Sequence, residues 1–358
     1  MAARGETEQT GQRVGADGLR TFVTAIFARV GMNDADAALL ADTLVAADLA
    51  GVHSHGVLRV PEYVGKLTTG GVNPRGVPTI ARDSGACLVV DGGNSMGQIG
   101  AHYAMAQAVA RAESTGIAAV AVRGSNHCGA MAYWAGMALP HDMIGLATTN
   151  ALPTMAPWGG AERLLGINPL AVAVPAGEEA PIVYDAAFAA TAHGKMRVYA
   201  QRGQQLPEGW ALDRNGQPTT DPLAGMAGLL MPSGGFKGTG LAMIMGILSA
   251  MLSGAAYGTE LGDMEHGAHA GQDGHFFAAI RVAAFEDVAR FKSRVDVAVR
   301  QLHAAHRAPG VECIYAPGEL EHTRHAIYTR DGIPLNAVTL ADLRRVASDL
   351  GVPVSGVL

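Results

Sequence analysis

The chain has little charge and few aromatic residues. Asp, Glu, Lys and Arg together make up 16% of the 358 residues, and Phe, Trp and Tyr make up 5%. Because 49% of the residues are hydrophobic, the composition excludes an intrinsically disordered chain, which needs low hydrophobicity and high net charge. A chain of this length instead suits a large buried core, divided into two or more lobes.

Cysteine is also scarce. The three cysteines, Cys87, Cys128 and Cys313, lie far apart and form no Cys-x-x-Cys pair. This pattern indicates a reducing compartment and argues against a disulfide framework or a thiolate zinc site. The net charge is −6, from 26 basic and 32 acidic residues, and no long basic run is present. We therefore expect no nucleic-acid partner.

We expect neither a signal peptide nor a membrane span. The first eight residues include Glu6 and Glu8, and no apolar segment follows them. The longest uncharged run covers residues 238–259, which is long enough to cross a bilayer. Glycine and serine interrupt it, and Lys237 is its only basic flank, so we predict a helix buried in the core or at a subunit interface. The expected location is the cytoplasm, with no membrane partner.

The order of apolar patterns mixes helices with strands, which indicates a mixed α/β or α+β fold. Helices are expected over residues 16–30, 34–49, 100–115, 238–253, 285–306 and 340–350. Strands are expected over residues 88–91, 117–123, 144–149, 170–175, 182–185 and 276–282.

A turn-rich connector at residues 70–76 divides the chain. We expect a flexible tail over 1–14 and a helical N-terminal lobe over 15–75 that packs with C-terminal helices from 285–358. Residues 76–284 then form an α/β domain.

The usual phosphate-binding fingerprints are absent. A doubly wound dinucleotide fold needs Gly-x-Gly-x-x-Gly between a strand and a helix. The nearest candidate, starting at Gly238, has Met243 where the third glycine belongs, and no Gly-x-x-x-x-Gly-Lys-Ser/Thr loop occurs. A dinucleotide would need another way to bind here.

The first cluster of reactive side chains is His53-Ser54-His55-Gly56, with Arg59 four residues after His55. On a helix, His55 and Arg59 would share one face. An arginine binds a carboxylate with two hydrogen bonds, and a histidine beside it exchanges a proton with an oxygen on C2. The pair therefore suits a 2-oxo or 2-hydroxy acid, although a capping histidine and a surface arginine would give the same spacing.

The second cluster, residues 124–129, follows the strand-like run 117–122. A strand end offers a rigid base for a catalytic group, which makes His127 a candidate acid or base. Neighbouring residues on an extended chain point to opposite sides, so Cys128 is interpreted as a packed residue and not as a nucleophile paired with His127.

Glycine- and proline-rich loops carry further polar residues, among them Asn150, Asp185 and Lys237. Such loops let backbone N–H groups reach phosphates, and Lys237 opens an expected helix. Each loop alone is explained by an ordinary turn, but together they favour a phosphate-bearing ligand. His266 and His269 are three residues apart around a glycine, a weak metal pattern, and we expect no metal.

Several of these motifs, spread over residues 16–354, resemble the second type of malate/L-lactate dehydrogenase family. That family also contains ureidoglycolate dehydrogenase, diketogulonate reductase, sulfolactate dehydrogenase and piperideine-2-carboxylate reductase. The motifs are Ser54-His55-Gly56-x-x-Arg59-x-Pro61-x-Tyr63, Ser125-Asn126-His127-x-Gly129, Gly166-x-Asn168-Pro169-Leu170, Gly194-Lys195, Leu206-Pro207-x-Gly209-Trp210, Gly235-x-Lys237-Gly238 and Pro317-Gly318-Glu319.

The resemblance implies a fold other than the Rossmann type, with a largely antiparallel sheet and a helical lobe. It also implies a homodimer that binds NAD or NADP in a cleft between lobes, in the 76–284 domain. The implied reaction transfers a hydride between the nicotinamide and C2 of a small 2-oxo or 2-hydroxy acid. Two alternatives stay open: reduction of a cyclic ketimine-2-carboxylate, and nucleotide binding without catalysis.

The resemblance further implies a role for individual residues. His55 and His127 match acid/base positions of different members, Arg59 would bind the carboxylate, and Ser54 belongs to the same catalytic block. The rigid setting at a strand end favours His127 of the two. The matching cofactor positions are Asn150, Ile182, Val183, Tyr184, Asp185, Lys237, Gly318 and Glu319.

Two stretches depart from the family pattern. Asp185 is followed by Ala186-Ala187-Phe188-Ala189, where the family usually has the small residues Ala, Thr and Ser, and Ile167 replaces a threonine. The lost hydroxyls leave the choice between NADH and NADPH open. They are also the reason for keeping the non-catalytic alternative.

Overall fold

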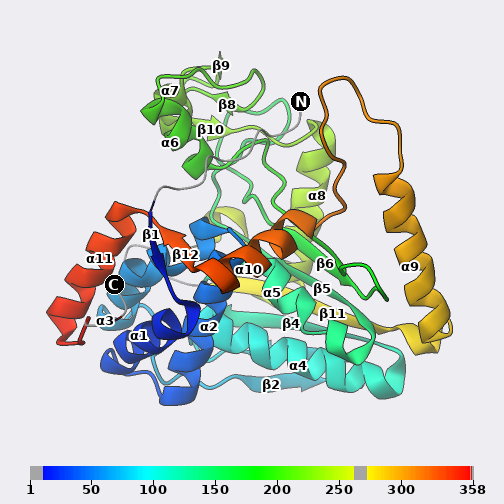
Figure 1. The fold of residues 1–358 in the computed structure, drawn as a ribbon. Coiled ribbons are helices and arrows are strands. Elements are labelled where there is room, and N and C mark those ends of the chain that lie inside the picture. Colours follow the sequence, from blue (N-terminus) through cyan, green and yellow to red (C-terminus); the bar gives the residue numbers. More distant parts are fainter. Residues whose placement is uncertain (1–10, 262–271, 355, 357–358) are drawn as a thin grey trace.

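A seven-stranded sheet forms the centre of the computed structural model, which describes residues 11–261, 272–354 and 356 (Figure 1). Its strand order is β2-β3-β4-β11-β5-β6-β7, and only the β3–β4 pair is parallel. The expected mixed fold with a largely antiparallel sheet is therefore confirmed. The strands are β2 (Thr79–Asp83), β3 (Cys87–Asp91), β4 (Ile117–Ser125), β5 (Met143–Thr149), β6 (Leu170–Val174), β7 (Ile182–Ala186) and β11 (Asp273–Arg281).

Two helices, α4 (Gly97–Thr115) and α5 (Met131–Gly136), pack on the sheet. The helix α4 presents a row of fully buried alanines to β4 and β11, and small side chains let the helix lie close to the strands. Val120 and Val122 of β4 and Phe277 of β11 fill the remaining space, as the alternation of strand side chains requires. This core holds the strand ends in fixed positions.

The apolar segment 238–253 forms α8 (Phe236–Gly246) and a π-helical turn (Ile247–Met251) that packs on β4, β5 and β11. The sequence predicts burial of this segment in the core or at a subunit interface, and in the single chain one side of it is buried. Met245 and Ala250 are buried, but Ile244 and Met251 on other sides are more than half exposed in the single chain. The described residues contain no helix long and apolar enough to cross a membrane.

The N-terminal lobe consists of α1 (Ala16–Arg29), α2 (Asp34–Leu49) and α3 (Val60–Thr68), with α10 (Glu319–Asp331) and α11 (Ala337–Leu350) packed against them. Asn33 caps α2 by accepting a hydrogen bond from the Asp36 backbone N–H. The predicted tail over 1–14 is too long: β1 (Gln12–Val14) pairs antiparallel with β12 (Ile333–Leu335), and Val14 is buried in this core.

The helix predicted over 285–306 is shorter in the structure. The prediction that it packs with the N-terminal lobe is wrong. The helix α9 (Val288–His303) does not join the N-terminal lobe but stands beside the β6–β7 connection (Figure 1). Its Asp296 accepts hydrogen bonds from the backbone N–H groups of Gly177, Glu178 and Glu179. Of the helices described within residues 285–358, α10 and α11 pack with the helical lobe.

A small unit that the sequence analysis did not predict lies beyond the main sheet, at the top of Figure 1. Its core contains Met155, Met196 and Phe188, so the bulky Phe188 packs inside this unit. Its elements are α6 (His193–Gln201), β8 (Ala211–Leu212), β9 (Pro218–Thr219), α7 (Pro222–Ala227) and β10 (Leu229–Leu230). Short 3-10 turns elsewhere cover His53–His55, Val57–Arg59, Leu139–His141, Gly258–Glu260 and Val282–Ala284.

Candidate active site

Asp48, near the end of α2, organises the segment that carries the first reactive cluster. Its carboxylate is buried and accepts hydrogen bonds from Val57 N–H at 2.7 Å and from His53 Nδ1 at 2.7 Å. Burial raises the pKa of the Asp48 carboxyl above its ordinary value. Gly56 lies so close that a Cβ there would come within 2.1 Å of Asp48 Oδ1. Only glycine lets the chain pass this carboxylate.

The chain from His53 to Arg59 forms two 3-10 turns and not the single helix considered for it. Hydrogen bonds within the segment still place its polar groups together. Ser54 Oγ lies 2.9 Å from His55 Nδ1, and Arg59 Nε donates to the Ser54 carbonyl at 2.9 Å. Arg59 also donates to Glu62 at 2.7 Å. Burial, with a smaller effect from Arg59, lowers the pKa of His55 to about 4.

His127, on the loop after β4, faces the same group. Its ring stacks on His55 with centroids 5.6 Å apart and planes 18° apart. Its Nδ1 lies 2.6 Å from the hydroxyl of Tyr63 on α3. Burial is the main reason that the pKa of His127 lies well below its ordinary value, followed by the charges of His55 and Arg59. Both imidazoles are therefore neutral near pH 7.

Two members of this group were missed by the sequence reasoning. Tyr63 was part of a family motif but received no role, and it is fully buried. Gln98, in the first turn of α4, donates through Nε2 to the Tyr63 hydroxyl at 3.3 Å. The motif spacing was a signal for Tyr63, whereas nothing in the pattern around Gln98 marked it.

Behind His127, the residue Cys128 is buried, as predicted for a packed thiol, and burial raises its pKa. Its sulfur lies 3.6 Å from Nδ1 of His275 on β11. The two nitrogens of His275 contact Thr149 Oγ1 and Ser125 Oγ, each at 2.8 Å. His275 thus links the ends of β4 and β5 beneath the loop that carries His127.

Most of the predicted cofactor residues cluster where β7 meets the start of α10. Val183 N–H donates to the Pro317 carbonyl at 2.9 Å, and Gly318 adopts φ +91°, with a Cβ position only 2.9 Å from the Val183 carbonyl oxygen. Ile182 is half-buried, and Tyr184 is exposed.

Asp185 joins this cluster to the loop of His127. Its carboxylate accepts a hydrogen bond at 2.7 Å from the backbone N–H of Ala132, five residues after His127. Asp185 is solvent-exposed in the single chain, but nearby protein desolvates part of its carboxyl and raises its pKa to about 6.

The remaining two predicted cofactor residues lie apart from this cluster. Asn150 is buried, and its amide joins two chain segments, donating to the Ala256 carbonyl and accepting from Gly274 N–H. Lys237 is exposed in the first turn of α8 and makes no hydrogen bond or ion pair within the described residues.

Comparison with known proteins decides the family. The family model described as "Malate/L-lactate dehydrogenase" matches residues 14–344. The chain belongs to this family. It is 35% identical to a malate dehydrogenase of Pyrococcus horikoshii, over 98% of this chain and 99% of the relative. The solved sulfolactate dehydrogenase of Methanocaldococcus jannaschii matches with a TM-score of 0.91 and 33% identity, covering 97% and 99% of the two chains.

Another relative broadens the chemistry within the family. A Delta(1)-pyrroline-2-carboxylate/Delta(1)-piperideine-2-carboxylate reductase of Pseudomonas putida is 34% identical, over 93% of this chain and 95% of the relative. As a member of the malate/L-lactate dehydrogenase family, the protein is an oxidoreductase that acts on CH–OH or CH–NH groups.

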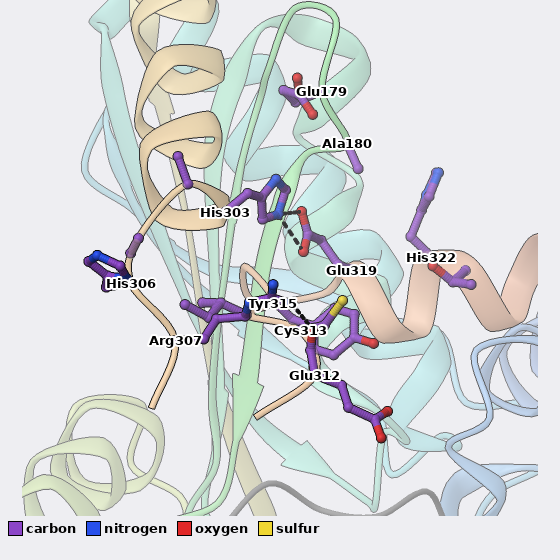
Figure 2. A pocket seen from close by; sticks show the side chains of 14 residues that line it. Glu179, Ala180, His303, His306, Arg307, Glu312, Cys313, Tyr315, Glu319 and His322 are labelled. Atoms are coloured by element: carbon purple, nitrogen blue, oxygen red, sulfur yellow. Dashed lines mark hydrogen bonds and ion pairs between the residues drawn. The ribbon is translucent and has the colours of Figure 1, made fainter. Parts of the chain in front are cut away.

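A cavity of about 680 Å³ lies between the C-terminal end of α9, the following loop and the first turns of α10 (Figure 2). Glu319 points into it, where its carboxylate binds His303 Nε2 at 2.7 Å and accepts from Ala316 N–H at 2.7 Å. Arg307 and Tyr315 also line this space. The part of the chain that the structure describes contains no cluster of three His, Cys, Asp or Glu residues suited to a metal, and His266 and His269 lie outside the described residues.

Replacing Gly56 with alanine tests the contact with Asp48. The new Cβ would overlap the carboxylate, so we expect Gly56→Ala to lower the free energy of unfolding by about 1–3 kcal/mol. Gly65→Ala on α3 is the matched control, because no atom lies within 4 Å of its Cβ position. That variant should be neutral or about 0.5–1 kcal/mol more stable. Equal behaviour of the two variants in urea denaturation would contradict the packing.

Asp273, at the start of β11, gives a stability prediction that depends on pH. Burial raises the pKa of its carboxyl to about 6, against an opposing effect of Lys66. Between about pH 4 and pH 6, the Asp273 carboxyl therefore keeps its proton in the folded protein but has lost it in the unfolded chain. The contribution of this group to the free energy of unfolding falls as pH rises through that range. We expect Asp273→Asn, which cannot ionise, to gain about 2 kcal/mol relative to wild type from pH 4 to pH 6.

The control for this measurement is Asp349→Asn, at an exposed carboxyl on α11. This variant gives the effect of an Asp-to-Asn change at an exposed position over the same pH range. A stability difference for Asp273→Asn that changes with pH no more than that of the control would contradict the raised pKa of Asp273.

Proposed function

We propose that the protein is an NAD(P)-dependent dehydrogenase that transfers a hydride between the nicotinamide and C2 of a small 2-oxo or 2-hydroxy acid. The observation that carries the proposal is the meeting of Arg59 with two stacked, neutral imidazoles, His55 and His127. A cation that binds a carboxylate beside groups that exchange a proton is what a 2-hydroxy acid requires.

The side-chain nitrogens of Arg59, His55 and His127 that have no partner among the described residues support a distinct role for each residue. Arg59 uses Nε and one terminal nitrogen on Ser54 and Glu62, and its other terminal nitrogen has no partner among the described residues. That nitrogen would bind the substrate carboxylate. His55 and His127 each use Nδ1 within the protein, so Nε2 is the nitrogen that would meet the oxygen on C2. We assign the proton transfer to His127, which the end of β4 holds.

The residues around β7 fit a dinucleotide. Because Gly318 has no side chain, its backbone lies directly against the backbone of Val183. The cavity beside Glu319 has the size of a site for a small molecule. We propose that residues Ile182 to Asp185, Gly318 and Glu319 bind the cofactor, with Lys237 at its phosphates and Asn150 shaping the site. The bound cofactor supplies or accepts the hydride.

Reduction of a cyclic ketimine-2-carboxylate is the second candidate, supported by the similarity to the Pseudomonas putida reductase. The carboxylate site would be the same, and the reduced bond would be C=N. Turnover of piperideine-2-carboxylate well above that of pyruvate and oxaloacetate would favour this candidate.

Fluorescence titration with NADH and with NADPH tests cofactor binding. We expect saturable binding of at least one of them, weakened roughly tenfold or more in Lys237→Ala, because a charge-assisted contact to phosphate is lost. Lys292→Ala is the control, since Lys292 on α9 pairs with Asp142. Wild-type protein that binds neither dinucleotide would contradict the proposal and favour a function without this cofactor.

Single alanine variants test the two histidines. We expect His127→Ala to lower kcat by about 10²- to 10⁴-fold while the affinity for the dinucleotide stays within twofold. His55→Ala should retain most of the turnover. The measurement is steady-state kinetics with malate, lactate, sulfolactate and a cyclic ketimine acid. Equal retention of activity in both variants would contradict the assignment, and collapse in His55→Ala alone would transfer the role to His55.

We also propose that two copies of the chain form a homodimer through α8 and the π-helical turn that follows it. Leu241, Ile244, Met251 and Leu252 form a line of apolar side chains that is 45% to 57% exposed in the single chain. Exposed apolar rows of this kind mark protein interfaces.

A charge in this row should separate the copies. We expect Ile244→Asp to convert the dimer to monomers at micromolar concentration, measured by light scattering after size-exclusion chromatography. Val338→Asp is the control, because Val338 on α11 is 72% exposed and lies outside the row. A dimer that persists in Ile244→Asp would exclude this face as the interface.

A further inference from the structure

The hydrogen bonds on the protein side of His127 decide where its proton lies. The Gly129 backbone N–H points at His127 Nδ1 at 3.3 Å. A backbone amide can only donate, and its direction is fixed by the chain. Nδ1 must therefore carry a lone pair, since a proton on it would face the Gly129 hydrogen.

The same argument fixes the hydroxyl of Tyr63. It lies 2.6 Å from Nδ1, a length typical of a strong hydrogen bond, and its single proton must point to that lone pair. The hydroxyl oxygen is then left as an acceptor. Gln98 satisfies it by donating through Nε2 at 3.3 Å, and both Tyr63 and Gln98 are fully buried. With the Gln98 amide in this orientation, which leaves its Oε1 buried without a partner, each hydrogen bond is donated in one direction, from Gln98 to Tyr63 and from Tyr63 to His127.

We propose that Tyr63 is a positioning residue for His127 that holds the neutral imidazole in the tautomer with its proton on Nε2. No other residue of the described chain bonds Nε2, so this N–H is directed to the ligand. The catalytic consequence rests on the proposed function: the oxygen on C2 of a 2-oxo acid accepts a hydrogen bond from this N–H. For the proton to pass to that oxygen, Nδ1 must gain one in the same step, and the Tyr63 hydroxyl at 2.6 Å is placed to donate it. Gln98 supports the arrangement by fixing the hydroxyl rotor of Tyr63.

The tautomer itself is measured by ¹⁵N nuclear magnetic resonance on protein labelled at histidine, without cofactor or substrate, at neutral pH. The His127 signals are those missing from His127→Ala. We expect Nε2 to be the protonated nitrogen and Nδ1 the bare one. A proton on Nδ1 would overturn the inference whatever the activity of the protein.

The role of the hydroxyl is tested kinetically with Tyr63→Phe. We expect kcat to fall at least tenfold, while KM and the affinity for NADH or NADPH stay within about twofold. Tyr133→Phe is the matched control: it removes a phenol hydroxyl that bonds Asp42 at 2.7 Å, away from the two histidines. Equal kcat in the two variants would show that the Tyr63 hydroxyl has only a structural role.

A second variant covers the case in which Tyr63→Phe folds poorly. Gln98→Leu leaves Tyr63 and His127 in place but removes the donor that fixes the hydroxyl, and we expect a smaller fall in kcat at unchanged KM. Unchanged kcat there would contradict the role of Gln98. If wild-type protein shows the Nε2 tautomer but no dinucleotide binding or turnover, the proposed function fails and the tautomer assignment stands.

Discussion

The insertion of β11 between β4 and β5 is the interaction on which the candidate site depends. It joins residues 273–281 to two strands that precede it by more than 100 positions. The ladder with β5 is regular, and the ladder with β4 shifts register between Asp273 and His275. At one end of this ladder, His275 bonds Ser125 of β4 and Thr149 of β5 with its two ring nitrogens. The loop of His127 leaves β4 directly after Ser125, so its position is set by a buried polar link between three strands.

The second half of the site comes from a different core, and two buried contacts bring the halves together. Asp48 holds the segment of His55 and Arg59 against the end of α2, and Tyr63 on α3 bonds His127 across the boundary between the helical lobe and the sheet. Buried polar groups that are fully bonded restrict a structure to one arrangement, because any shift leaves one of them without a partner. The stacking of His55 on His127 follows from these two contacts.

Local patterns in the sequence predicted much of this arrangement. The apolar periods of α1 and α2, the cap at Asn33 and the strand-like run before Ser125 depend on neighbouring residues, and the structure has all of them. The shared motifs indicated His55, Arg59 and His127 as one group. Features set by distant contacts could not be predicted in this way: the pairing of Gln12–Val14 with Ile333–Leu335, the place of α9, and the bond from Gln98 to Tyr63. The exposure of one side of α8 could not be predicted either. An apolar helix that packs on its own sheet and one that packs on another chain have the same composition.

The most direct test of the account is a crystal structure of the protein with NADH or NADPH and oxamate, a 2-oxo acid analogue that cannot be reduced. The account predicts that the oxamate carboxylate binds Arg59 and that its carbonyl oxygen accepts a hydrogen bond from His127 Nε2. It also predicts that the nicotinamide ring packs against the carbonyl carbon of oxamate, which corresponds to C2 of the substrate. Oxamate bound with its carboxylate away from Arg59, or with its carbonyl oxygen on a group other than His127, would contradict it.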